Sequence, residues 1–214
     1  SAPPASHARP RRPRGLLSPP GVLFMQTIPG RPCLARGGQG SVTSAKLVAE
    51  VALSPDKSFP AVPEYGPERA GAPFVAFTRL SDEPIQIYSA IEHPDYVLIL
   101  DPTLLDVVNV TSGTSDGAVV IVNSEGACSE LAGRPELKGR KVYTVPATKI
   151  ALETIKRAIP NTPLIGALAK VSGLFSLEGI LDEVKTSLSR KFNEDVVNAN
   201  LAAVKRGYEE VSDE

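Results

Sequence analysis

A short glycine-rich stretch is the part of the sequence whose residue types best suit ligand chemistry. It reads Arg36-Gly37-Gly38-Gln39-Gly40 and runs into an apolar segment with helical spacing, residues 42–53. Glycine lets the backbone adopt positive φ angles and approach a ligand without a Cβ in the way. The N–H groups at a helix start favour an anionic group. The stretch is neither a full G-x-G-x-x-G nor a P-loop. It predicts either an anion-holding turn or a tight strand-to-helix turn that binds nothing.

Residues that hold metals or act as nucleophiles are scarce. The chain has two cysteines, Cys33 and Cys128, and two histidines, His7 and His93. A [4Fe–4S] cluster is normally held by four thiolates, and two distant cysteines do not make a metal site. We therefore expect no metal to be held by this chain alone. We also expect neither a Ser-His-Asp nor a Cys-His catalytic pair.

Charge and hydropathy argue against two classes of partner. The net charge is −1, and residues 1–24 hold four arginines and no acidic residue, so the remainder is acidic. Nucleic-acid binding usually needs a concentrated basic face, so we expect no nucleic-acid partner. No apolar run approaches the roughly 20 residues that span a bilayer, so we expect no membrane partner.

The elements that must position the glycine-rich stretch follow from hydrophobic patterning. Strands are predicted at residues 25–36, 74–80, 85–88, 96–100, 118–122 and 141–145, and helices at 42–53, 103–110, 147–158, 164–171, 177–189 and 194–208. Continuous apolar strands are typical of a parallel sheet covered on both faces. Strands alternating with helices predict an α/β fold with right-handed crossovers. The fold class is therefore α/β, with a mostly parallel sheet flanked by helices.

The predicted organisation is one domain with tails. Residues 1–24 form a Pro/Arg-rich arm that is disordered or held by a partner, because its composition buries little apolar surface. Residues 25–211 form the single domain, and residues 212–214 an acidic tail. We expect the chain to fray from Glu209 onward. A hairpin is possible between the strands at 74–80 and 85–88.

Five stretches, taken together and in order, resemble the gamma subunits of pyruvate:ferredoxin oxidoreductases, within the 2-oxoacid:ferredoxin oxidoreductase family. They are the glycine-rich turn at 36–40, the helix segment 44–50, the loop 63–73, the segment 159–168 and the C-terminal segment 200–209. The resemblance covers residues 25–211. Several motifs agreeing in order are far more specific than the glycine-rich turn taken singly.

The resemblance implies a place in a larger enzyme. Such enzymes decarboxylate a 2-oxoacid on thiamine diphosphate and pass electrons through [4Fe–4S] clusters to ferredoxin. The acyl group leaves on coenzyme A, or the cycle runs in reverse. Thiamine diphosphate, magnesium and the clusters are then expected on alpha, beta and delta-type partner subunits. The complex is expected in the cytoplasm, and this chain is expected to help accommodate coenzyme A.

The resemblance also suggests cofactor-binding residues, whereas no catalytic or metal-binding residue is assigned. Arg36, Gly37, Gly38, Gln39 and Gly40 would face a diphosphate, with the Arg36 guanidinium donating charge-assisted hydrogen bonds. The alternative is a turn packed against a neighbouring subunit. The family pattern has an aromatic-His-Gly where this chain has Cys33-Leu34-Ala35, so the turn is less tightly bent or φ at Ala35 is negative.

Two further stretches carry predicted roles. Glu68 and Arg69, with Glu64 and Tyr65 on the same loop, would shape the active-site entrance or form intersubunit ion pairs. In the segment Asn161-Thr162-Pro163, the Asn or Thr side chain would cap a helix, with the proline in its first turn.

Three alternatives to this function stay open. The first is a free-standing nucleotide- or coenzyme A-binding module that uses the same glycine-rich turn. The second is the equivalent subunit for another 2-oxoacid, 2-oxoisovalerate or 2-oxoglutarate. The third is a purely structural interaction protein, which explains the composition but not the ordered motifs.

Overall fold

The computed structural model describes six parts of the chain. They are residues 21–27, 34–36, 62–64, 74–80, 93–106 and 109–213. The first four segments are strands described by their backbone. The predicted helix at 42–53 and the predicted strand at 85–88, with the hairpin it would form, lie outside the described residues.

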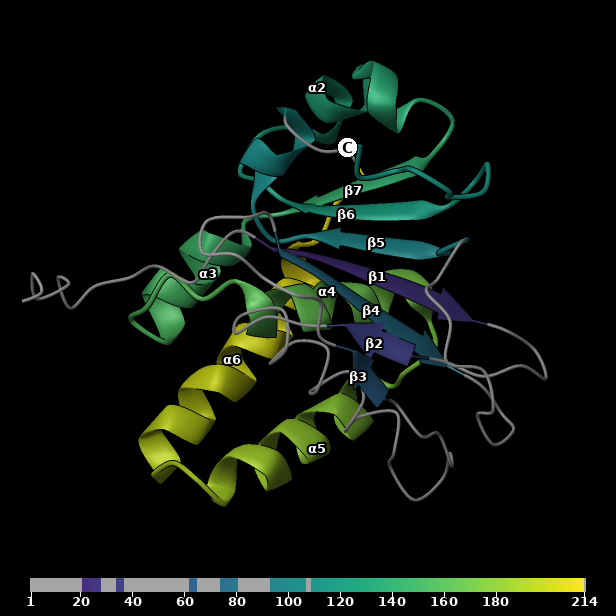
Figure 1. Cartoon of the computed structure of the whole chain (residues 1–214). Coiled ribbons are helices and arrows are strands. Elements are labelled where there is room, and N and C mark those ends of the chain that lie inside the picture. The colour runs from purple at the N-terminus through teal and green to yellow at the C-terminus, as the bar shows by residue number, and fades with distance from the viewer. Residues whose placement is uncertain are drawn as a thin grey trace, which may run out of the picture.

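A five-stranded sheet forms the centre of the molecule (Figure 1). In spatial order its strands are β4 (Phe74–Leu80), β1 (Gly21–Thr27), β5 (Tyr96–Ile99), β6 (Val119–Asn123) and β7 (Lys141–Val145). β1 is parallel to β4, and β5, β6 and β7 are parallel to one another, whereas β1 and β5 are antiparallel. A separate parallel pair, β2 (Leu34–Arg36) and β3 (Val62–Glu64), lies beside β4. The predicted mostly parallel sheet is confirmed.

The strands β5 and β6 are apolar except for Asn123, the last residue of β6, because both sheet faces are covered. Val97 and Ile99 project toward one apolar cluster, and Leu98 projects toward the other. Val120 and Ile121 alternate in the same way. Successive side chains of a strand point to opposite faces, so a strand covered on both sides has no polar positions to alternate.

Short helices cover one face and longer helices the other. The first face carries the 3₁₀ helices η1 (Pro102–Asp106) and η2 (Pro135–Leu137) and the helix α2 (Cys128–Ala132). The other face carries α3 (Ala147–Thr154), α4 (Asn161–Ser172), α5 (Leu177–Ser189) and α6 (Glu194–Glu210). α5 matches its prediction, whereas the described residues of the predicted helix at 103–110 form the 3₁₀ helix η1 up to Asp106 and are not helical at 109–110. α2 and η2 were not predicted.

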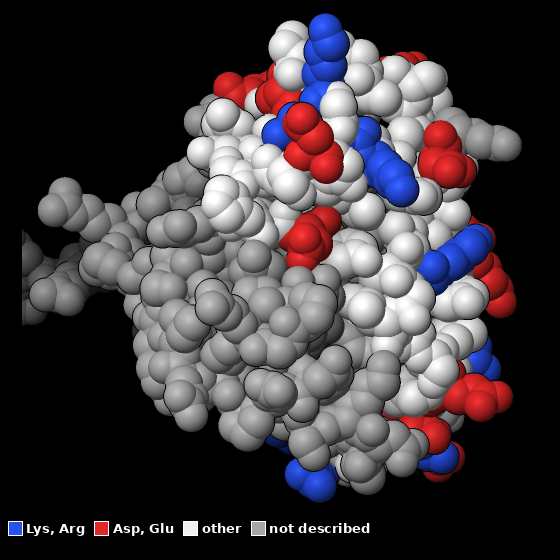
Figure 2. Space-filling view, turned by 90° about the vertical axis from the view of Figure 1, so that its right-hand side faces the viewer, with Lys and Arg blue, Asp and Glu red and all other residues white. Residues whose placement is uncertain are grey.

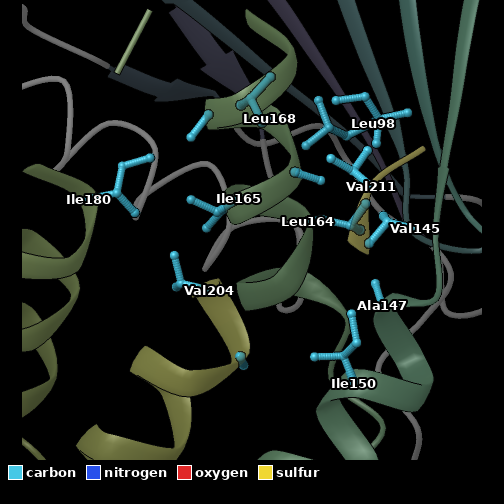
Figure 3. Packing of buried hydrophobic residues seen from close by; sticks show 14 of the residues in the cluster. Leu98, Val145, Ala147, Ile150, Leu164, Ile165, Leu168, Ile180, Val204 and Val211 are labelled. Carbon is cyan, nitrogen blue, oxygen red and sulfur yellow. The ribbon is translucent and has the colours of Figure 1, made fainter. Parts of the chain in front are cut away.

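α4 is buried on all sides, between the sheet and the outer helices. Its first nine residues, 161–169, are all buried. Figure 3 shows Leu164 and Leu168 on the same helix as Ile165, with Leu98 and Val145 of the sheet nearby. Val204 of α6 and Ile180 of α5 belong to the same cluster. A helix that is apolar all round is typical of such a central position.

Two glycines allow α4 and α6 to cross at close range. A Cβ added to Gly166 would lie 2.0 Å from the carbonyl oxygen of Val204. A Cβ added to Gly207 would lie 2.0 Å from the carbonyl oxygen of Pro163. Real Cβ atoms do not approach backbone oxygens so closely, so each helix needs glycine where it faces the other. The segments 159–168 and 200–209 therefore pack directly against each other.

The predicted cap of α4 is wrong. Pro160 occupies the cap position, and no side chain accepts a capping hydrogen bond there. Thr162 instead donates its hydroxyl hydrogen to the side-chain oxygen of Asn200 in α6, at 3.1 Å. Both side chains are buried, so the Thr162 hydroxyl serves a contact between helices. Pro163 does lie in the first turn, as expected.

Both ends of the predicted domain differ from expectation. β1 begins at Gly21, inside the range assigned to the arm, and the single strand predicted at 25–36 is divided between β1 and β2. The predicted fraying from Glu209 is wrong, because α6 continues to Glu210 and Val211 is only 7% exposed. Ser212 then exchanges backbone hydrogen bonds of 2.8 and 3.0 Å with Thr144 of β7. An apolar residue and a free sheet edge hold the chain end in place.

Candidate functional site

The predicted cofactor-binding residues lie mostly outside the described part of the chain. Arg36 is the last residue of β2, and its Cα pairs with that of Glu64, the last residue of β3. Gly37, Gly38, Gln39, Gly40, Glu68 and Arg69 are outside the described residues. The register nevertheless relates the two predicted regions, which are far apart in sequence.

The glycine-rich turn and the long loop leave the β2–β3 pair from the same edge. The two strands are parallel, so both carboxyl ends meet there. Gly37 follows β2 directly, and Tyr65 follows β3 directly. Ligands of α/β proteins commonly bind outside the carboxyl ends of parallel strands. The backbone thus brings the start of both predicted segments together.

A second candidate site lies at the carboxyl ends of β6 and β7. It is an open pocket of about 440 Å³. The residues that line it are Ser124, Glu125, Gly126, Ala127, Thr144, Pro146, Lys149, Glu210 and Ser212. They come from the loop after β6, the end of β7, the start of α3 and the chain end. No local sequence signal marked this pocket, because its residues are spread from 124 to 212.

Asn123 holds the elements around this pocket in register. It is the last residue of β6 and only 8% exposed. Its side-chain nitrogen donates to the carbonyl oxygen of Leu100 at 2.8 Å and to the hydroxyl of Thr148 at 2.7 Å. Its side-chain oxygen accepts from the backbone N–H of Thr148 at 3.0 Å. One amide therefore joins the ends of β5 and β6 to the start of α3.

Replacing Asn123 with alanine should destabilise the protein by about 2 kcal/mol, because the buried carbonyl of Leu100 and the half-buried polar groups of Thr148 lose their partner. Asn198→Ala, at an exposed position of α6, is the control and should change stability by less than about 0.5 kcal/mol. Urea unfolding of the full chain measures both. Equal midpoints for the two variants would contradict the role given to Asn123.

The charged groups at this pocket are only partly paired. Lys149 Nζ lies 4.0 Å from Glu125 Oε2, and both side chains are more than half exposed. The Glu210 carboxylate accepts a hydrogen bond from Arg206 Nε at 2.5 Å. Arg206 also donates to Glu153 at 2.6 Å, and this hydrogen bond lowers the pKa of Glu153. Glu210 is thus engaged by a short hydrogen bond, whereas Lys149 makes only the long ion pair with Glu125.

The described residues do not fit an iron–sulfur cluster. Within residues 93–106 and 109–213 there is no group of three or more His, Cys, Asp or Glu side chains that could hold a metal ion. Cys128 is buried and donates its thiol hydrogen to the carbonyl oxygen of Val142 at 2.9 Å. Burial raises the pKa of this thiol, whereas metal ligation needs a thiolate. No step of cluster chemistry is assigned to these residues.

The described surface shows charge of both signs. On the face in Figure 2, basic and acidic side chains lie interspersed over the described residues. Arg134, for example, pairs with both Asp106 and Glu136. In the described part of the chain, no helix is both long and apolar enough to cross a bilayer.

Comparison with known proteins places this fold and these segments in one family. The family model for pyruvate ferredoxin/flavodoxin oxidoreductase matches residues 33–210. Pyruvate synthase subunit PorC of Thermotoga maritima is 43% identical over 176 residues, which is 82% of this chain and 91% of the relative. The pyruvate/ketoisovalerate oxidoreductases common subunit gamma of Pyrococcus furiosus is 43% identical over 174 residues, covering 81% of this chain and 92% of the relative.

Solved structures share this fold. The crystal structure of pyruvate oxidoreductase subunit PORC from Thermotoga maritima superposes with a TM-score of 0.71 at 37% identity, covering 86% of this chain and 98% of that one. A 2-oxoglutarate:ferredoxin oxidoreductase from Magnetococcus marinus shares the fold, with a TM-score of 0.58 at 18% identity over 30% of its chain. The chain belongs to the pyruvate ferredoxin/flavodoxin oxidoreductase family.

Proposed function

We propose that this chain is the gamma subunit of a cytoplasmic, multi-subunit pyruvate:ferredoxin oxidoreductase. The complex oxidatively decarboxylates pyruvate with coenzyme A to acetyl-CoA and carbon dioxide, or runs in the reverse direction. The observation that carries the proposal is the 43% identity to a pyruvate synthase subunit over 91% of that subunit's length. Such coverage leaves little of the relative without a counterpart here.

Partner chains supply the redox groups in this proposal. Alpha, beta and delta-type subunits hold thiamine diphosphate, magnesium and the [4Fe–4S] clusters, and ferredoxin accepts the electrons. The names of the relatives, as subunits, support the need for partners. The cysteine count supports clusters held elsewhere, since two thiols are fewer than the four that a cluster normally takes.

In this proposal the chain helps to bind coenzyme A at the carboxyl ends of β2 and β3. Arg36 and Glu64 are register partners at that edge, and the glycine-rich turn and the loop with Glu68 and Arg69 both follow from it. A guanidinium beside glycine N–H groups suits a diphosphate. The alternative use of this edge is contact with a neighbouring subunit.

Arg36→Ala in the assembled complex separates these two uses. If Arg36 binds the diphosphate, the KM for coenzyme A should rise by roughly tenfold to a hundredfold, because a hydrogen bond to a charged group contributes roughly 1.5–3 kcal/mol. The KM for pyruvate should stay unchanged. The matched control is Arg157→Ala, at an exposed position after α3. Unchanged kinetics would exclude the diphosphate role, and a complex that no longer assembles would favour the subunit contact.

A second candidate function is that of a subunit shared by two oxidoreductases. It is favoured by the Pyrococcus furiosus relative, whose name assigns it to both pyruvate and ketoisovalerate enzymes. A shared subunit cannot itself choose between the two 2-oxoacids. Copurification of this chain with two distinct sets of catalytic partners would establish this function, whereas a single set would exclude it.

A further inference from the structure

The pocket at the carboxyl ends of β6 and β7 is built beside the start of α3. The first intrahelical hydrogen bond of α3 runs from the N–H of Ile150 to the carbonyl oxygen of Pro146. The N–H groups of Ala147 and Lys149 therefore precede that bond, while Asn123 accepts from Thr148 between them. Pro146 and Lys149 line the pocket. A helix start carries partial positive charge and offers N–H donors.

A second, independent feature of the pocket is the hydroxyl of Thr144. Thr144 is only 6% exposed and lines the pocket. Its side chain projects to the same sheet face as that of Val142, the face covered by α2. Gly126 and Ala127, which lead into α2, line the pocket on that side. The Thr144 hydroxyl makes no hydrogen bond to any other part of the described structure.

A buried hydroxyl without a partner is uncommon and costs free energy, so a bound group that supplies the partner is its simplest explanation. The neighbouring hydroxyl of Ser124 accepts from the N–H of Gly126 at 3.0 Å and keeps its own hydrogen available for donation. Ser124, Thr144 and the residues Pro146 and Lys149 at the helix start all line this one pocket. Donors of this kind recognise an oxyanion.

Lys149 is the cationic side chain that lines the pocket, and its carboxylate partner is distant. Lys149 is 4.0 Å from Glu125, which is beyond hydrogen-bond length, and Glu125 is 68% exposed and can turn toward solvent. Glu210 is held by Arg206 on the other side. The Lys149 ammonium can therefore meet a ligand while Glu125 opposes it.

We propose that this pocket binds a small oxyanion of the phosphate class. The anion contacts the start of α3, the Lys149 ammonium and the Thr144 hydroxyl. The proposal does not rest on the coenzyme A role of Arg36, because the pocket is made by β6, β7 and α3 and not by β2 and β3. The source of the phosphate is either free phosphate or the phosphate group of a nucleotide.

The test is a binding titration of the full chain with inorganic phosphate, followed by thermal unfolding, with chloride replaced so that ionic strength stays constant. Mass action predicts a saturable rise in Tm for the wild type. Lys149→Gln should weaken the apparent Kd about tenfold, the size expected from losing one charge-assisted hydrogen bond. Glu125→Gln should tighten it, because an opposing carboxylate is removed. Lys141→Gln, at the other end of β7, is the control and should leave Kd unchanged.

Thr144→Val distinguishes a binding role from a structural one. Valine has nearly the same shape and lacks the hydroxyl, so this variant should be at least as stable as the wild type in chloride. It should nevertheless lose most of its response to phosphate. A repeat titration with ADP identifies the source: saturation at lower concentration than phosphate indicates a nucleotide, and equal or weaker binding indicates free phosphate.

Two results would overturn the proposal. One is the absence of a saturable phosphate effect on the wild type. The other is an equal effect on the wild type, Lys149→Gln and Thr144→Val, which would mean that phosphate acts elsewhere and that water satisfies the Thr144 hydroxyl. Neither result would affect the proposed gamma-subunit function, which is measured by turnover of the complex.

Discussion

Gly207→Ala is expected to destabilise the protein by more than about 3 kcal/mol, since inserting atoms into a close-packed contact forces backbone shifts. The added Cβ would lie 2.0 Å from the carbonyl oxygen of Pro163 and 2.6 Å from its carbonyl carbon. Those atoms belong to the backbone of α4, which is buried on all sides and cannot move aside. A typical domain has only about 5–15 kcal/mol of stability in total.

The direction of the change in stability distinguishes close packing from helix propensity. Within a helix, alanine is ordinarily more favourable than glycine by about 1 kcal/mol. α6 spans Glu194–Glu210, so helix propensity alone predicts that Gly207→Ala stabilises the chain. Close packing against α4 predicts the opposite. Gly166→Ala should likewise destabilise the protein, because its Cβ would lie 2.0 Å from the carbonyl oxygen of Val204.

Gly133→Ala provides the matched control. Gly133 follows α2 with φ at −70°, and a Cβ there would meet its nearest atoms at 3.7 and 3.8 Å, an ordinary contact distance. This variant should unfold within about 0.5 kcal/mol of the wild type. Urea unfolding of the three variants measures the difference. A Gly207→Ala chain as stable as Gly133→Ala would contradict the described crossing of α4 and α6.

Local patterning predicted the strands and helices where periodicity is strong. The bounds of β4, β7 and α5 were predicted correctly, and those of β5 and β6 to within one residue. The hydrophobic pattern of a buried strand or an amphipathic helix stops where the element ends, so the sequence indicates its first and last residues. The α/β fold class followed directly from these elements.

Long-range pairing explains what the sequence could not show. α4 begins at Asn161, and Thr162 in its first turn is bonded to Asn200 of α6, a contact that has no local signature in the sequence. The chain end is ordered because Ser212 pairs with Thr144. The close approach at Gly166 and Gly207 was likewise invisible, although both glycines lie in segments that carried the family resemblance.

Of the two candidate sites, one could be predicted from the sequence and the other could not. The glycine-rich turn was recognisable because its residues are consecutive, and the β2–β3 register then placed Arg36 beside Glu64. The pocket beside α3 was not recognisable, since it is lined by residues as distant as Ser124 and Ser212. Only the folded chain brings such residues together.

A gamma subunit should be required for turnover of its complex, and this is the second large effect expected. Without this chain, the partner subunits would lack the surface that we propose accommodates coenzyme A. Positioning of a reactant contributes several kcal/mol to catalysis, so removing it should reduce the rate by orders of magnitude. The fold of the chain must be intact for this role. Gly133→Ala should therefore restore activity to the partners, and Gly207→Ala should fail to do so.

The most direct test is reconstitution from separately purified subunits. The alpha, beta and delta-type chains are assayed for pyruvate- and coenzyme A-dependent reduction of ferredoxin, with and without this chain. We predict that the chain copurifies with these partners and that ferredoxin reduction falls to background when it is omitted. Full activity of the partners without it, or a chain that does not associate with them, would contradict its assignment as the gamma subunit.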